Sequence, residues 1–252
     1  MHAIVLSLVS AACVFSGLFF GYFLNQALPK NHLSNDSKDA IKLASGMIAT
    51  LAALVLGLLV ASAKSSFDLI NGENVTIASK IIVLDRTLAH YGPEAEPARV
   101  ELKRAVAAGI EIIWGKKTEV EGLTALEAAN GMELTQDKVN DLQPATDAQR
   151  ALLAQARQLS NDLIQSRWLV IEQSQNSLPA MFFVVLLLWL TLLYVSIGLI
   201  APRNATVISA MLVCALSYSA ALFLIMEMSQ PTSGFIRLPS APMEKALAHL
   251  GH

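Results

Sequence analysis

The sequence is poor in charge and in cysteine. Only 15% of its 252 residues are Asp, Glu, Lys or Arg, compared with about 25% in ordinary soluble domains. The two cysteines, Cys13 and Cys214, both fall inside apolar runs. They give no sign of a disulfide framework, and their spacing excludes a Cys-x-x-Cys redox or zinc motif.

The motifs of common enzymes are also missing. The sequence contains no Gly-rich phosphate loop, no histidine pair at metal-ligand spacing and no Gly-x-Ser-x-Gly elbow. No basic stripe with interleaved aromatic residues suggests a nucleic-acid partner. Glu119, Glu121 and Glu127 have the pattern of a solvated helix face rather than of a catalytic pair. We therefore expect no enzyme, no cofactor and no metal site.

Apolar residues are abundant, at 54% of the chain. They concentrate in four runs, residues 4–24, 41–63, 178–200 and 207–226, whose only charged residue is Lys42 at the start of the second. Each run is long enough for the roughly 20 residues that a spanning helix needs. No Lys or Arg precedes the first run, and the run is too long for a signal-peptide core, so we expect an anchor rather than a cleaved signal. The sequence predicts four transmembrane helices.

A polar segment of about 110 residues, 64–177, separates the second and third runs and is long enough for a small domain. Apolar residues recur at helical spacing over residues 67–90, 98–114 and 146–173. The stretch "YGPEAEP" (91–97) ends the first of these helices with Gly and Pro. No strand pattern occurs. The predicted fold is therefore all-α: an integral membrane protein with four transmembrane helices and a helical soluble stalk, formed where the second and third spans extend out of the bilayer.

The predicted organisation has four parts. They are a transmembrane hairpin of spans one and two (1–66), the helical soluble domain (67–177), a transmembrane hairpin of spans three and four (178–228), and a C-terminal tail that folds back on the soluble domain (229–252).

The second run has a small residue at every fourth position, which predicts an edge for close helix packing. The residues expected to pack are Ala49, Ala53, Gly57 and Ala61 in this run, together with Gly17 and Gly21 of "GLFFG" in the first. Apolar helices in lipid associate through close van der Waals contact between such edges. We expect spans one and two to pack against each other here.

A row of bulky residues lies about 200° around the helix from the small edge. Its members are Met47, Leu51, Val55 and Leu59. Such a row either faces lipid or, in a ring of subunits, surrounds a pore with an apolar constriction.

Glu227 closes the fourth run, and the prolines and Gly234 that follow favour a turn over a continued helix. A carboxylate at the end of a span is either hydrated at the interface or part of an ion-binding site. We also expect "PTSGFIRLP" (231–239) to fold back over the soluble helices, with Phe235, Ile236 and Leu238 filling a groove.

Three segments resemble those of the bacterial bestrophin-like membrane proteins. They are "LASGMIATLAALVLGLLVASAKSSFD", "LDRTLAHYGPEAEPAR" and "EMSQPTSGFIRLPSAPMEKAL". Bestrophins are pentameric anion channels whose second span forms an apolar neck and whose helical domain and termini are cytoplasmic. The resemblance thus implies a homo-oligomer, a pentamer if the likeness extends that far, in a bacterial inner membrane with anions as possible cargo. The Lys and Arg counts near the span ends are evenly split and do not define the orientation. The resemblance implies that the termini and the soluble domain are cytoplasmic.

Two functions remain open from the sequence. The first is a homo-oligomeric, anion-conducting channel whose second span lines the pore. The second is a non-conducting, membrane-anchored helical scaffold or sensor. A purified monomer or dimer would leave no central pore and would favour the scaffold.

Overall fold

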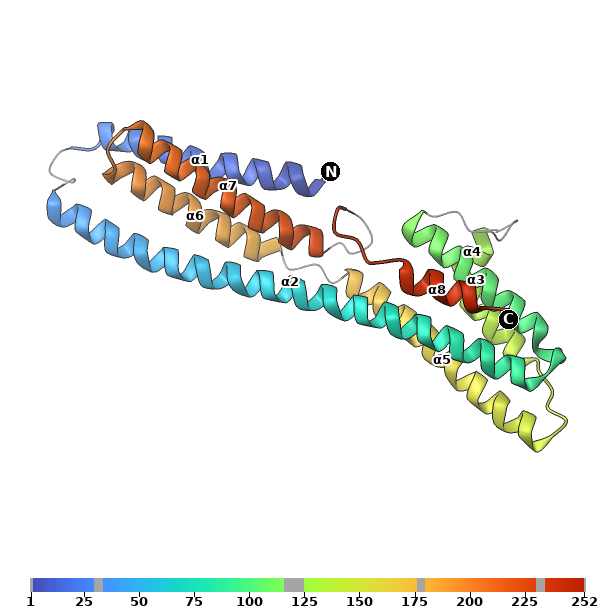
Figure 1. Ribbon diagram of the computed structural model, residues 1–252. Coiled ribbons are helices and arrows are strands. Elements are labelled where there is room, and N and C mark those ends of the chain that lie inside the picture. Colours follow the sequence, from blue (N-terminus) through green and yellow to red (C-terminus); the bar gives the residue numbers. More distant parts are fainter. Residues whose placement is uncertain (1, 30–33, 116–124, 176–179, 230–233, 252) are drawn as a thin grey trace. The chain divides into compact units, whose positions relative to one another are not determined.

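The computed structural model describes residues 2–29, 34–115, 125–175, 180–229 and 234–251, and helices dominate it (Figure 1). The elements are α1 (His2–Ala27), α2 (Asn35–Tyr91), η2 (Pro93–Ala95), α3 (Glu96–Trp114), α4 (Ala125–Asn140), α5 (Asp147–Gln175), α6 (Ala180–Ile200), α7 (Ala205–Met228) and α8 (Ala241–His249). No strand occurs within these ranges, so the predicted all-α class is confirmed.

Four of the described helices are long and apolar enough to cross a membrane: α1, α2, α6 and α7. The four predicted long apolar helices are thus confirmed. α2 continues without interruption from its apolar run to Tyr91. Residues 64–91 contain no Pro and a single Gly, Gly72, which a long helix tolerates. α5 ends at Gln175 and α6 begins at Ala180. The expected extension of the third span therefore falls outside the described residues.

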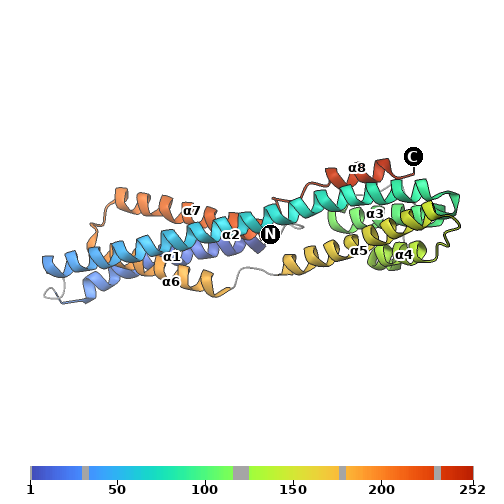
Figure 2. The ribbon, with the colours of Figure 1, turned by 90° about the horizontal axis from the view of Figure 1, so that it is seen from below.

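The chain forms two compact units. One, here the span unit, comprises Met1–Phe67 and Ser177–Ile236, and the other, here the polar unit, comprises Asp68–Asn176 and Arg237–His252. Within the span unit, α1 packs against α6 and α7 (Figures 1 and 2). Its core includes Val14 and Leu18 of α1, Leu186 of α6, and Leu222 and Ile225 of α7.

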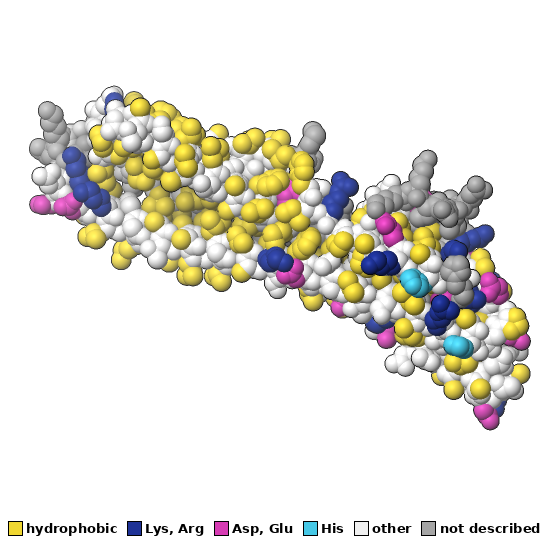
Figure 3. All heavy atoms as spheres, in the orientation of Figure 1, with side chains coloured by type: hydrophobic (Ala, Val, Ile, Leu, Met, Phe, Trp, Pro, Cys, Tyr) yellow, Lys and Arg dark blue, Asp and Glu magenta, His cyan; other side chains and the backbone are white. Residues whose placement is uncertain are grey.

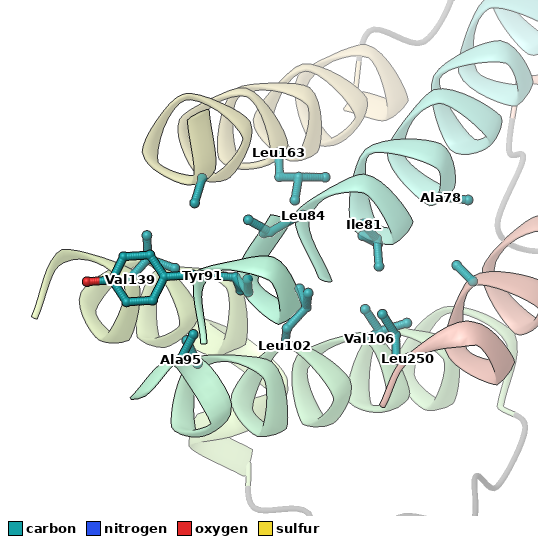
Figure 4. Close-up of a cluster of buried hydrophobic side chains, with 14 of the residues drawn as sticks. Ala78, Ile81, Leu84, Tyr91, Ala95, Leu102, Val106, Val139, Leu163 and Leu250 are labelled. Carbon is teal, nitrogen blue, oxygen red and sulfur yellow. The ribbon is translucent and has the colours of Figure 1, made fainter. Parts of the chain in front are cut away.

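The polar unit has its own apolar core (Figure 4). α2 contributes Ile81, Leu84 and Leu88, and α3 contributes Leu102 and Val106. α4 and α5 add Val139 and Leu163, and Leu250 follows the end of α8. Each of these side chains is 2% exposed or less. The helical spacing in the sequence places them on one face of each helix, and burial of that face stabilises helices that would be marginal alone.

The turn between α2 and α3 forms where the sequence predicts a break. Gly92 has φ of 129°, a conformation that residues with a Cβ rarely adopt. Pro93 and Pro97 follow at the starts of η2 and α3, where the missing N–H of proline is tolerated. α3 ends at Trp114 because Gly115 caps it in the left-handed conformation.

Candidate functional site

The apolar run of α2 is the most open of the four spans. In its most apolar window 11% of the residues are buried, compared with 33% in α1. One face, which includes Ala52, Leu59 and Ala63, packs into the span unit. Residues of the opposite face, such as Met47, Leu54 and Leu58, are exposed among the described residues. On the side shown in Figure 3, apolar side chains cover the span unit and charged ones gather near its ends.

The predicted bulky row does not stay on this open face. Met47 is 71% exposed and Leu51 49% exposed, whereas Val55 is half-buried and Leu59 is only 5% exposed. The reason is geometric: a step of four residues turns a helix by about 400°, so the row drifts by about 40° at each step. Leu59 thus lies in the apolar core of the span unit. Leu54 and Leu58, 60% and 62% exposed, share the open face instead.

The small edge of α2 is also open. Ala49, Ala53, Gly57 and Ala61 are all exposed. No atom of a neighbouring helix lies within 4 Å of the position that a Cβ would take on Gly57. Ala49 and Ala53 border an apolar cavity of about 330 Å³ whose other walls include Leu190 of α6 and Tyr218 of α7. The edge is therefore open at Gly57, whereas Ala49 and Ala53 border a cavity shared with α6 and α7.

The other predicted edge, on α1, is closely packed. A Cβ on Gly17 would lie 2.9 Å from the carbonyl oxygen of Thr191, and one on Gly21 would lie 2.9 Å from the Cα of Gly198. Both partners belong to α6, so the expected packing of these glycines against the second span is wrong. Gly198 allows the approach from its own side, because it too lacks a Cβ.

Glu227, in the last turn of α7, is buried and holds the chain that follows. It is 4% exposed, and its carboxylate accepts hydrogen bonds from the backbone N–H groups of Phe235, at 2.5 Å, and Ile236, at 3.3 Å. Gly234 lies directly against the carboxylate with φ of 113°. This geometry satisfies a buried charge with two backbone donors. The carboxylate is therefore buried rather than hydrated, and its two hydrogen bonds connect the end of α7 to the segment that follows.

Replacing Glu227 with alanine should release this segment. Loss of the acceptor leaves two backbone donors without their partner, so the chain around Gly234 should open more often. Tryptic cleavage after Arg237 should then become about tenfold faster than in the wild type, on the scale of one charge-assisted hydrogen bond. Glu172→Ala, a change to an exposed carboxylate of α5, is the control and should cleave as the wild type does. Equal cleavage of both variants would contradict the anchoring role.

The tail beyond Arg237 packs within the polar unit. Leu238 is 5% exposed, and its carbonyl accepts a hydrogen bond of 2.8 Å from the indole of Trp114. The amide of Asn74 donates to the carbonyl of Pro239 at 3.1 Å. α8 then packs against α3. Phe235, which was also expected to fill a groove, is instead 75% exposed.

A buried ion pair that the sequence reasoning missed joins α2 to α3. Asp85 is 1% exposed, and Arg99 contacts both of its oxygens, from Nε at 2.8 Å and from Nη2 at 3.3 Å. Hydrogen bonding to Asp85 raises the pKa of Arg99, so the guanidinium stays charged. A sequence signal existed: the two residues are fourteen positions apart and flank the Gly92-Pro93 turn that brings the helices together.

A second missed contact ties the α6–α7 connection to α1. Arg203 donates to the carbonyl of Tyr22 and lies 5.2 Å from the centre of its ring. The amide of Asn25 donates to the carbonyl of Leu199 at 2.6 Å. These bonds satisfy carbonyl groups near the helix ends.

The described residues contain no group of His, Cys, Asp and Glu that could hold a metal ion. Glu119 and Glu121 fall outside what the structure describes, and Glu127 lies in the first turn of α4. The site that remains is the open face of α2.

Comparison with known families assigns the chain. Residues 12–243 match the bestrophin-like domain, and the protein therefore belongs to the bestrophin-like family. The resemblance of the three sequence segments is confirmed.

Solved structures with similar folds include two variants of a bacterial bestrophin homologue from Klebsiella pneumoniae. One aligns with a TM-score of 0.68 at 12% identity and covers 99% of this chain and 97% of that chain. The other aligns with a TM-score of 0.67 at 11% identity and covers 99% of both chains. A search of curated protein sequences found no match.

Proposed function

We propose that the protein is a homo-oligomeric, anion-conducting membrane channel in which α2 of each copy lines the pore. Membership of the bestrophin-like family supports the class of function. The observation that carries the proposal is the open face of α2, where Met47, Leu51, Leu54 and Leu58 are exposed within the protomer. The protein performs no catalysis in this account.

The open face of α2 has a bulky middle and one smooth flank. Met47, Leu51, Leu54 and Leu58 form the bulky middle, and Gly57 and its small neighbours form the smooth flank. The smooth flank lets the next copy approach closely in a head-to-tail contact, which forms a ring when the rotation between copies closes. Family membership favours five copies. In such a ring Met47, Leu51 and Leu54 face the axis.

The barrier in this pore is the wetting of an apolar ring. The apolar run of α2 carries no charged residue between Lys42 and Lys64. Uncharged apolar constrictions limit ion flow by excluding water. The family relation favours anions as the permeating species.

The polar unit is then a soluble stalk that follows the second span and precedes the third. We place it with both termini in the cytoplasm of a bacterial cell and the spans in the inner membrane. α2 would join the two parts mechanically, since it carries both the apolar run and the Ile81, Leu84 and Leu88 face of the polar core.

Polar substitutions on the open face should raise conduction. Leu51→Ser and Leu54→Ser lower the dewetting barrier without removing the helix, so anion flux through liposomes containing the protein should rise about tenfold. Leu192→Ser is the matched control, because Leu192 is 43% exposed on α6 and faces no proposed pore. If all three variants conduct as the wild type while remaining folded and oligomeric, the channel proposal fails and the scaffold function replaces it.

Filling the smooth flank should dissociate the ring. Gly57→Leu adds a side chain where the protomer leaves open space, so each copy should fold, but neighbouring copies could no longer approach closely. Size-exclusion chromatography with light scattering should show smaller species. Leu58→Ile keeps the volume and should leave the assembly unchanged. If the Gly57→Leu assembly has the same mass as the wild-type assembly, this flank does not pack against a neighbouring copy.

A further inference from the structure

A second cavity of the span unit lies where α2 begins and α6 ends. Its volume is about 280 Å³, and its walls are Lys42, Ser45, Ser196, Ile197, Ile200 and Ala201. The surface that this cavity exposes is almost entirely apolar, and Lys42 and two serines are among the residues around it. It is separate from the cavity beside Ala49 and Ala53.

Ser45 has an unused hydroxyl here. Its Oγ is shielded from solvent and makes no hydrogen bond with any described residue. Serine and threonine in helices usually donate to the carbonyl four residues earlier, as Thr50 does to Gly46 and Ser196 does to Leu192. A buried hydroxyl without a hydrogen-bond partner is unfavourable, and a bound ligand could supply that partner.

Lys42 supplies a cation that can change partners. Its ammonium lies 2.9 Å from the carboxylate of Asp39, and the two side chains are 61% and 70% exposed. An exposed ion pair of this kind contributes little to stability because water competes for both groups. The ammonium can therefore turn to an anionic group in the cavity at small energetic loss. Lys38, one turn earlier, does not line the cavity.

The position along the helices defines the ligand. Charged residues appear at this end of α2, directly before the apolar run that crosses the bilayer, which is the level of lipid headgroups. A lysine ammonium at this depth can form a charge-assisted hydrogen bond with the phosphate of a headgroup. Apolar walls suit the adjoining acyl chain. We propose that the cavity between α2 and α6 binds an anionic phospholipid, with its phosphate at Lys42 and Ser45 and its chain along Ile197 and Ile200.

The test uses the full-length protein purified in detergent, with dioctanoyl phosphatidylglycerol as the probe and thermal stability as the readout. The lipid should raise the melting temperature saturably. Lys42→Gln should weaken the apparent affinity about tenfold and Ser45→Ala about threefold, on the scale of single hydrogen bonds to a charged group. Lys42→Arg keeps the cation and should bind within about threefold of the wild type. Lys38→Gln is the matched control and should leave binding unchanged.

Two further probes separate the sources of phosphate. Dioctanoyl phosphatidylcholine has the same chains but no net charge and should stabilise the protein less. Inorganic phosphate has the charge without the chains and should not reproduce the stabilisation. Equal stabilisation by phosphatidylcholine, full protection by inorganic phosphate, or wild-type binding by Lys42→Gln would each overturn the proposal. The outcome does not depend on whether the protein conducts ions.

Discussion

Replacing Gly21 with alanine should separate α1 from α6 and strongly destabilise the span unit. The added Cβ would lie 2.9 Å from the Cα of Gly198 and would also meet the backbone of Val195. Backbone atoms cannot rotate away as a flexible side chain can, so one of the two helices must shift. Overpacking of this kind costs about 1–3 kcal/mol, and contact with backbone places the change at the upper end. The midpoint of thermal unfolding in detergent measures it.

Gly46→Ala is the control for this prediction. Nothing lies within 4 Å of a Cβ at Gly46 on α2, and alanine favours a helix more than glycine does. The control should therefore unfold at the wild-type temperature or above. A Gly21→Ala protein as stable as the Gly46→Ala protein would mean that α1 and α6 do not approach as closely as described.

Replacing Asp85 with asparagine should destabilise the polar unit by about 3–5 kcal/mol, because it leaves the Arg99 guanidinium without its buried counter-ion. The side chains of Asp85 and Arg99 are 2% and 14% exposed, so water replaces the lost partner poorly. Circular dichroism of the purified protein during heating should show the loss.

Two variants bracket this effect. Asp147→Asn removes an exposed ion pair with Arg150, whose side chains are 92% and 61% exposed, and should change stability by less than about 0.5 kcal/mol. Arg99→Gln added to Asp85→Asn removes the guanidinium that has lost its buried partner and retains only the exposed Glu96, and it should recover part of the loss. If Asp85→Asn and Asp147→Asn behave alike, the pair does not hold α2 to α3.

The class of fold could be predicted because length and polarity alone define it. An uncharged run such as residues 207–226 has one stable form in lipid, a helix. Likewise, the Gly92-Pro93 break ends α2 in any context. The predicted helical class and the four spans follow from these local constraints.

The partners of the helices could not be predicted in the same way. In lipid, apolar faces gain little from leaving the solvent, so contact depends on matched small residues on two helices. Gly21 packs against Gly198 of α6. Gly198 is a single small residue rather than part of a repeated pattern, so the sequence did not indicate it as the partner. The prediction that Met47 and Leu59 share one face is wrong. Each step of four residues rotates the position by about 40°, so Leu59 lies in the core whereas Met47 is exposed.

The central claim is that α2 of several copies surrounds a path for anions. The most direct test is a cryo-EM reconstruction of the full-length protein in lipid nanodiscs. The account predicts a closed ring of copies with Met47, Leu51 and Leu54 facing the axis and the small flank around Gly57 packed against the next copy. A monomer, or a dimer without a central path, would contradict it.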